Sequence, residues 1–260
     1  MRWPPYQHVF FDCDSTLSAI EGIDVLAEAT GKQAEIEALT NAAMDGKLDL
    51  EDVYAKRLQA ILPTQQQVQM IRHAYKQHIV EDAAELLQAL TYLGHTVYII
   101  SGGLAEPVEE FGIFLGVPRE RIRAVKLNYN ALAGNWWDSS SGNQAQYMDY
   151  GAGALTVSDG KAEVVKELLG DGGNGRSLLI GDGTSDLLAS RAVDLFVGFG
   201  GIIPRARVKA EAPVFINTPS IAPLLLLAAG PDALNQLKQT PFANLAKKSS
   251  DLIESGALEF

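Results

Sequence analysis

The chain has 260 residues, of which 47% are hydrophobic, and a formal net charge of −11. Such a chain can bury one substantial core and a subsidiary module, and an acidic balance without dense runs of Lys or Arg excludes nucleic acid as a partner. Cys13 is the single cysteine, so an intrachain disulfide is excluded and a reducing compartment is expected. The longest apolar run, 221–230, is shorter than the ~20 residues that span a bilayer, and the N-terminal residues lack an apolar signal core. We therefore expect a soluble, cytoplasmic protein with no membrane partner.

Short apolar runs alternate with helical patterns along most of the chain. Four clear runs lie at 8–11, 95–100, 177–180 and 194–199, and a weaker one lies at 121–127. Runs of this kind are typical of strands buried on both faces of a parallel sheet. Before the second run, residues 81–94 put five apolar side chains on one helical face, and Gly94 ends that helix: Ala83, Leu86, Leu87, Leu90 and Leu93. The alternation predicts an α/β fold with a Rossmann-like open parallel sheet.

Residues 16–78 interrupt this alternation, because they contain several helical patterns and no convincing strand. One helical face within them ends at Gly31 and consists of Ile23, Leu26, Ala27 and Thr30. We predict a helical cap inserted directly after the first strand, with the α/β catalytic core formed by residues 1–15 and 79–260.

Two segments of the predicted core depart from the strand and helix alternation. Residues 128–160 are rich in Gly, Ser, Asn and Tyr, which predicts a hairpin or flap. Within it, "NWWD" at 135–138 fits the hydrophobic cluster of a hairpin better than an aromatic binding patch. Residues 218–260 are predicted to form a helical tail packed on the core.

Polar motifs follow three of the predicted strands. They are "DCDST" at 12–16, "SGG" at 101–103 and "GDGTSD" at 181–186. Taken singly, each motif is equally typical of a turn or a helix cap. Ligands of open parallel sheets bind in the crevice beyond the carboxyl ends of the strands. The joint placement of the three motifs therefore favours a single site.

The acidic residues of these motifs favour metal-assisted chemistry. An oxygen-rich negative pocket suits a hard cation such as Mg²⁺, and its ligands would be Asp12, Asp14, Asp182 and Asp186. Asp12 can then attack an electrophile such as phosphorus, while Asp14 can transfer protons as general acid and base. The groups expected to hold phosphate oxygens are the Ser101 hydroxyl, the N–H groups of Gly102 and Gly103, and Lys161.

The motifs also resemble a known family. The segments "FFDCDSTLSAIEGIDVLA", "AMDGKLDLEDVYAKRL", "YIISGGL", "DGKAEVV", "IGDGTSD" and "VDLFVGFGGIIPRARVKAEA" are similar to the phosphoserine phosphatase subgroup of the haloacid dehalogenase-like hydrolases. The resemblance extends over residues 9–216 and has the motifs in the family's order. It implies that Asp12 becomes an aspartyl phosphate and that Asp14 protonates the leaving hydroxyl and then activates water. It also implies that Mg²⁺ is held by the Asp12 side chain, the main-chain carbonyl of Asp14 and Asp182, with Asp186 in support.

The resemblance further implies how a substrate is held. Ser101 and Lys161 match phosphate ligands, Glu21 matches the acid that meets a substrate amine, and Arg57 matches the base that holds a substrate carboxylate. Met44 matches an apolar lid contact. Ser185 occupies a substrate-contact position where many members have Asn or Thr, and Leu104 stands where the family often has Phe. Without the resemblance, Arg57 is typical of a solvated helix residue and Glu21 of a helix first-turn acid.

Three further features have unremarkable interpretations. Cys13 is expected to be a buried structural thiol, since its side chain should point to the opposite strand face from Asp12 and Asp14. His73 and His78 do not share a helix face and are expected to be solvated. Residues 170–175, "GDGGNG", lack the Lys-Ser or Lys-Thr of a phosphate loop and are expected to be a flexible connection.

These observations predict a Mg²⁺-dependent phosphatase that converts O-phospho-L-serine to L-serine and phosphate. One alternative is the same chemistry on another small phosphomonoester, such as a sugar phosphate or a methionine-salvage intermediate. Another is a phosphotransferase, in which an alcohol replaces water. A non-catalytic phosphometabolite-binding protein is a third, against which the presence of both Asp12 and Asp14 argues. Monomer and homodimer both stay open.

Overall fold

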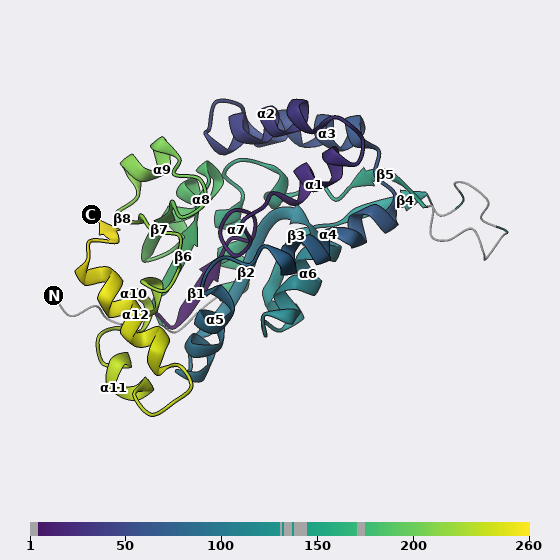
Figure 1. Ribbon diagram of the computed structural model, residues 1–260. Helices are drawn as coiled ribbons and strands as arrows, with labels where there is room; N and C mark the ends of the chain where they lie inside the picture. Colours follow the sequence, from purple (N-terminus) through teal and green to yellow (C-terminus); the bar gives the residue numbers. More distant parts are fainter. Residues whose placement is uncertain (1–4, 131, 133–136, 138–144, 171–174) are drawn as a thin grey trace.

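The computed structural model describes residues 5–130, 132, 137, 145–170 and 175–260. Its largest sheet has seven strands in the order β3-β2-β1-β6-β7-β8-β9, and all neighbours pair in parallel except β8 and β9 (Figure 1). Their bounds are β1 His8–Phe11, β2 Thr96–Leu104, β3 Ile122–Val125, β6 Ser177–Gly181, β7 Leu195–Phe199, β8 Val214–Ile216 and β9 Leu258–Glu259. The predicted open parallel sheet is confirmed.

Both faces of this sheet are buried, which explains the unbroken apolar runs. Successive β1 residues point to opposite faces: Val9 and Phe11 join one hydrophobic cluster and Phe10 joins another. The first cluster includes side chains of α5 Ala83–Tyr92, α6 Ala105–Phe114, α10 Leu224–Ala229 and α12 Ala243–Glu254. The second includes side chains of α7 Lys161–Leu169, α8 Thr184–Ala189 and α9 Ala206–Glu211. Cys13 is buried in the first cluster, as expected for a structural thiol.

Four helices lie between β1 and α5, over the carboxyl ends of the strands (Figure 1). They are α1 Gly22–Glu28, α2 Gln33–Met44, α3 Leu50–Ile61 and α4 Gln65–Gln77. A capping box of Thr64 and Gln67 begins α4. No strand occurs among residues 16–78, all of which the structure describes. The predicted helical content of the cap is therefore observed, and its exact boundaries stay a prediction.

The segment 128–160 contains an antiparallel hairpin that contacts the cap. Its strands are β4 Leu127–Asn130 and β5 Gln146–Tyr150. The Gln65 N–H donates to the Ala145 carbonyl at 2.9 Å, and the Tyr147 N–H donates to the Pro63 carbonyl at 2.9 Å. In "NWWD", Trp137 is 68% exposed, whereas Trp136 lies outside the described residues, as do residues 171–174 of the predicted connection.

The C-terminal tail is helical only in part. The helices α10, α11 Ala233–Leu237 and α12 agree with the prediction, but β9 pairs antiparallel with β8 at the edge of the sheet. The sequence did not predict β9, because two residues are too few to show an alternating pattern. Short 3₁₀ turns occur at Arg119–Arg121, Ala154–Thr156 and Ser190–Ala192. Within the described part of the chain, every helix is too short or too polar to cross a membrane.

Candidate active site

The polar ends of three strands meet in one crevice beneath the cap. Asp12 follows β1, Ser101 lies near the end of β2, and Asp182 follows β6. Because β1 pairs in parallel with both β2 and β6, these ends lie at one edge of the sheet. The site side chains predicted there are buried: Asp12, Asp14, Ser101, Lys161, Asp182 and Asp186. One pocket is lined by these loops and by the cap.

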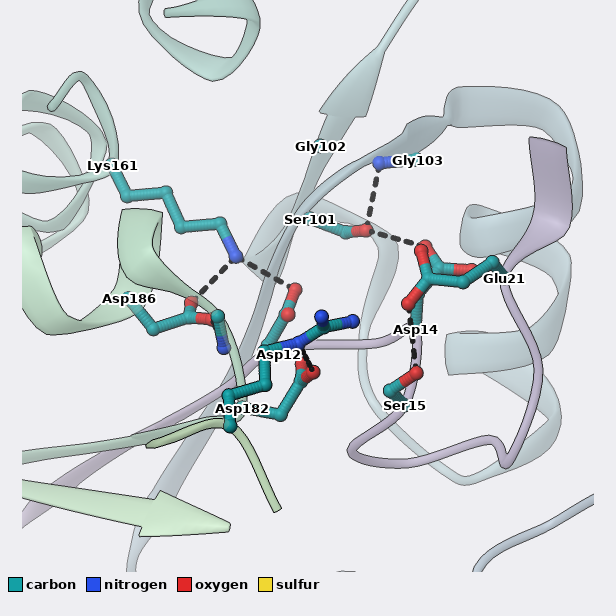
Figure 2. A network of polar contacts seen from close by, with 12 residues as sticks. Asp12, Asp14, Ser15, Glu21, Ser101, Gly102, Gly103, Lys161, Asp182 and Asp186 are labelled. Carbon is teal, nitrogen blue, oxygen red and sulfur yellow. Dashed lines mark hydrogen bonds and ion pairs between the residues drawn. The ribbon is translucent and has the colours of Figure 1, made fainter. Parts of the chain in front are cut away.

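Lys161 links the first and third motifs. Figure 2 shows its ammonium group between two carboxylates, with Nζ 2.8 Å from Asp12 Oδ1 and 2.6 Å from Asp186 Oδ1. Burial alone would lower the pKa of Lys161, but the two carboxylates raise it above its usual value. Lys161 thus stays charged, and its position at the first residue of α7 is fixed by two buried ion pairs.

Three carboxylates form a site that fits a divalent cation. Oxygen atoms of Asp12, Asp182 and Asp186 lie within 4.8 Å of one another. Asp182 Oδ1 is buried and has no hydrogen-bond partner among the described residues. Burial raises the pKa of Asp182 to about 6, although Arg205 opposes the shift, and burial and the Asp12 charge raise the pKa of Asp186. The site is therefore short of positive charge, and all of its donors are hard oxygens of the kind that Mg²⁺ prefers.

Asp14 has two carboxylate oxygens in different surroundings. Oδ1 accepts hydrogen bonds from the Tyr75 hydroxyl and from the Gly22 N–H, both at 2.7 Å. Oδ2 lies 3.4 Å from the Ser101 hydroxyl. Burial, followed by the Asp12 charge, raises the pKa of Asp14 to about 6 against these hydrogen bonds. A carboxyl group whose pKa lies near neutrality can both give and accept a proton.

The "SGG" residues at the end of β2 pack tightly against Asp14. The Gly103 N–H donates to the Ser101 hydroxyl at 2.9 Å (Figure 2). A Cβ atom at Gly103 would lie 2.6 Å from Asp14 Oδ2 and 3.0 Å from Ser101 Oγ. Glycine is required there because any side chain would displace these groups.

Three of the four side chains predicted to contact the substrate or lie beside it come from the cap. Glu21, Met44 and Arg57 from the cap and Ser185 from α8 all line the same pocket. Glu21 accepts a hydrogen bond from Ser15 at 2.7 Å, and burial raises its pKa. The predicted site residues thus line this pocket except Asp182 and Asp186, which each have a carboxylate oxygen within 4.8 Å of one of Asp12. Their individual roles stay predictions.

Arg57 is not a solvated helix residue, so the interpretation of this residue without the family resemblance was wrong. It is 6% exposed and lies over the Tyr54 ring, with Cζ 5.4 Å from the ring centroid. Its Nη1 donates to Thr40 Oγ1 at 3.1 Å, and Thr40 donates to Asp24 at 3.1 Å. Its Nε is buried without a partner in the described structure. The Arg57 side chain thus lines the pocket, and its Nε–H group is available to a substrate acceptor.

Several further residues complete the site and were not predicted from the sequence. Arg205 Nε pairs with Asp182 Oδ2 at 3.0 Å, and its Nη1 pairs with Asp45 of the cap at 3.1 Å. Tyr54 donates to the Gly102 carbonyl at 2.9 Å. Arg205 lies in the segment "GGIIPRARVKAEA", which drew attention only through its resemblance to the family. No local pattern distinguishes these side chains from ordinary helix residues.

Residues 9–191 match the family model described as haloacid dehalogenase-like hydrolase. The chain belongs to the haloacid dehalogenase-like hydrolases. Mouse phosphoserine phosphatase is 32% identical to it over 210 residues, which cover 80% of this chain and 88% of the mouse protein. These similarities identify the chain as a phosphatase of this family.

Solved structures have the same fold. A phosphoserine phosphohydrolase-like protein from Francisella tularensis superposes with a TM-score of 0.68 at 27% identity, covering 85% of this chain and 99% of that protein. A phospho-aspartyl intermediate analogue of phosphoserine phosphatase superposes with a TM-score of 0.71 at 23% identity, covering 85% of this chain and 98% of the other. These solved structures thus share the fold of this chain.

Proposed function

We propose that this phosphatase hydrolyses O-phospho-L-serine to L-serine and phosphate. The observation that carries the proposal is that one pocket contains both the Glu21 carboxyl group and the Arg57 guanidinium. The Nε atom of Arg57 has no hydrogen-bond partner in the described structure. An amino acid presents an ammonium and a carboxylate side by side, which these two groups complement. The relatives named as phosphoserine phosphatases support this choice of substrate.

A divalent cation, with Mg²⁺ as the expected ion, belongs to the proposal. Asp12 and Asp182 would hold it together with the main-chain carbonyl of Asp14, and Asp186 would support it. When bound, the ion would neutralise phosphate charge and make the phosphorus atom more electrophilic. The buried Asp182 Oδ1, which has no partner in the described residues, supports this assignment.

The proposed chemistry proceeds in two displacements at phosphorus. An Asp12 oxygen attacks, its bond to phosphorus forms, and the bond from phosphorus to the serine oxygen breaks. Protonated Asp14 gives its proton to that oxygen, so serine leaves as an alcohol. Deprotonated Asp14 then takes a proton from water, whose oxygen attacks phosphorus and releases phosphate and the Asp12 carboxylate. Lys161 and Ser101 hold phosphate oxygens during both displacements.

Contacts between cap and core support a closed site during the first displacement. Thr184 of α8 donates to the Met44 carbonyl at 2.8 Å, and Tyr54 donates to Gly102 across the pocket. Excluding water until serine departs protects the acyl phosphate and strengthens electrostatic interactions inside the pocket.

Phosphate release from O-phospho-L-serine, measured beside sugar, glycerol and nucleotide monophosphates, tests the proposal. We expect preferential release from phosphoserine with Mg²⁺, none with EDTA, and none from an Asp12→Asn protein. Arg57→Ala should lose phosphoserine turnover, whereas Arg72→Ala, a cap variant that removes a surface ion pair with Glu110, should keep it. Preference for another ester would reject the substrate, and activity in Asp12→Asn would reject the mechanism.

Two remaining expectations belong with this proposal. Added serine or homoserine that becomes phosphorylated would identify transfer to an alcohol in place of hydrolysis. The cytoplasmic location, which the single cysteine favours, stays a prediction that fluorescence microscopy of a tagged chain can check.

A further inference from the structure

We propose that Tyr75 of the cap is a positioning residue for Asp14, whose hydroxyl anchors one carboxylate oxygen so that the other faces the leaving group. The inference rests on the proposed role of Asp14 as proton donor in phosphate-ester cleavage. It concerns a side chain that the sequence motifs do not include.

The two oxygens of Asp14 are held differently. Both donors to Oδ1 come from the cap: the Tyr75 hydroxyl and the Gly22 N–H, each at 2.7 Å. Oδ2 has only the longer contact of 3.4 Å with Ser101. Two short hydrogen bonds to one oxygen fix the rotation of the carboxyl group. They leave Oδ2, which lies beside the "SGG" residues of β2 (Figure 2), as the oxygen that can exchange a proton with a substrate.

Packing alone does not explain a tyrosine at this position. Val68, Ile71 and Tyr75 form the buried face of α4, and the Tyr75 ring stacks on Phe111 of α6 with centroids 5.4 Å apart. A phenylalanine would fill the same space. The hydroxyl is therefore an additional feature, and a buried tyrosine hydroxyl needs a hydrogen-bond partner.

The surrounding chain is shaped to admit this hydroxyl. A Cβ atom at Gly22 would overlap the Tyr75 hydroxyl and lie 3.3 Å from an Ile71 methyl group. Glycine at this position leaves the space that the hydroxyl occupies, and its N–H supplies the second hydrogen bond to Asp14.

Tyr75 lies at the base of the cap, where the chain returns to the core. The Ser18 hydroxyl donates to the His78 carbonyl at 3.2 Å, and the Ala19 N–H donates to the same carbonyl at 2.7 Å. These bonds tie the end of α4 to the loop that follows Asp14. The end of α4 that holds Tyr75 is thus bonded directly to the loop that follows Asp14.

A comparison of leaving groups tests the proposal. An alkyl phosphate such as phosphoserine needs a proton on its leaving oxygen, whereas p-nitrophenyl phosphate releases a stable phenolate with little need of one. For Tyr75→Phe we expect kcat/KM for phosphoserine to fall about 10-fold or more, the effect of one hydrogen bond to a charged group. The value of kcat/KM reports only the first displacement, in which the two leaving groups differ, so kcat/KM for p-nitrophenyl phosphate should stay within about twofold. The matched control is Tyr98→Phe, which removes the hydroxyl of a β2 tyrosine that contacts His8. This variant should leave the kinetic constants for both substrates unchanged.

A second variant guards against a folding defect in the first. Gly22→Ala keeps Tyr75 but displaces its hydroxyl, and it should reproduce the selective loss on the alkyl ester. Equal losses on both substrates for both variants would overturn the proposal in favour of a structural role, as would unchanged rates. If the wild-type enzyme prefers another alkyl phosphate, the phosphoserine assignment fails, and the same comparison with that ester still decides the role of Tyr75.

Discussion

Replacing Thr40 by valine should weaken binding of the substrate carboxylate without slowing phosphoryl transfer. Thr40 is fully buried in α2, where its hydroxyl accepts from Arg57 Nη1 at 3.1 Å and donates to Asp24 at 3.1 Å. Valine keeps the shape of threonine but removes both bonds. A hydrogen bond to a charged group contributes about 1.5–3 kcal/mol, and each ~1.4 kcal/mol is a factor of ten in binding. We therefore expect KM for phosphoserine to rise about 10- to 100-fold in Thr40→Val.

Phosphoethanolamine provides the internal control for this variant, because it has the phosphate and the amine but no carboxylate. Its KM should stay within about twofold in Thr40→Val, and Thr40→Ser, which keeps the hydroxyl, should restore phosphoserine binding. Steady-state kinetics on both substrates give the answer. A parallel rise in KM for both substrates would show that the substitution disturbs the pocket generally, and the assignment of Thr40 as the support of Arg57 would be refuted.

Three further predictions concern stability. Arg205→Ala leaves the buried carboxylate of Asp182 without its partner and frees Asp45 of the cap, so the free energy of unfolding in urea with EDTA should fall by about 3–5 kcal/mol; an unchanged midpoint would contradict this. At a hundredfold excess over its Kd, Mg²⁺ should raise the free energy of unfolding of the wild-type protein by about 2.7 kcal/mol. The melting temperature measured by differential scanning fluorimetry should rise accordingly, and Asp182→Asn should abolish that rise. Burial lowers the pKa of His95, whose ring contacts the Tyr6 carbonyl, so the unfolded chain binds the proton more readily. Stability should then decrease as the pH falls through the unfolded value of about 6.5 toward the lower folded value, and melting curves of His95→Gln should show a smaller decrease.

The sheet could be predicted because burial on both faces produces unbroken apolar runs. Phe10 and Phe11 pack on opposite sides of β1, so neither position tolerates a polar residue and the run is visible in the sequence. β8 has three residues and β9 has two, and their pairing depends on where the chain lies after the end of α12. Such short edge strands leave no periodic pattern, because the tertiary structure alone selects them.

The catalytic loops were predictable for a related reason. A parallel sheet forces the residues after β1, β2 and β6 to one edge, so Asp12, Ser101 and Asp182 are near one another as soon as the strands are known. Tyr75 and Arg205 reach the same place from elements whose position relative to the sheet is set by packing of the cap. In the sequence, Tyr75 is only one more apolar position of an amphipathic helix. The buried position of Arg57 was likewise indicated only by resemblance to the family.

Asp182 connects the candidate cation site to the position of the cap. Its Oδ2 pairs with Arg205, which also reaches Asp45 at the end of α2. Its Oδ1 has no partner among the described residues, and one oxygen of Asp182 belongs to the three-carboxylate group that fits a divalent cation. If a cation binds Oδ1, the cation and the arginine use different oxygens of one carboxylate and do not compete for it. Because one guanidinium pairs with both Asp182 and Asp45, closure of the cap and ordering of the candidate cation site should stabilise each other.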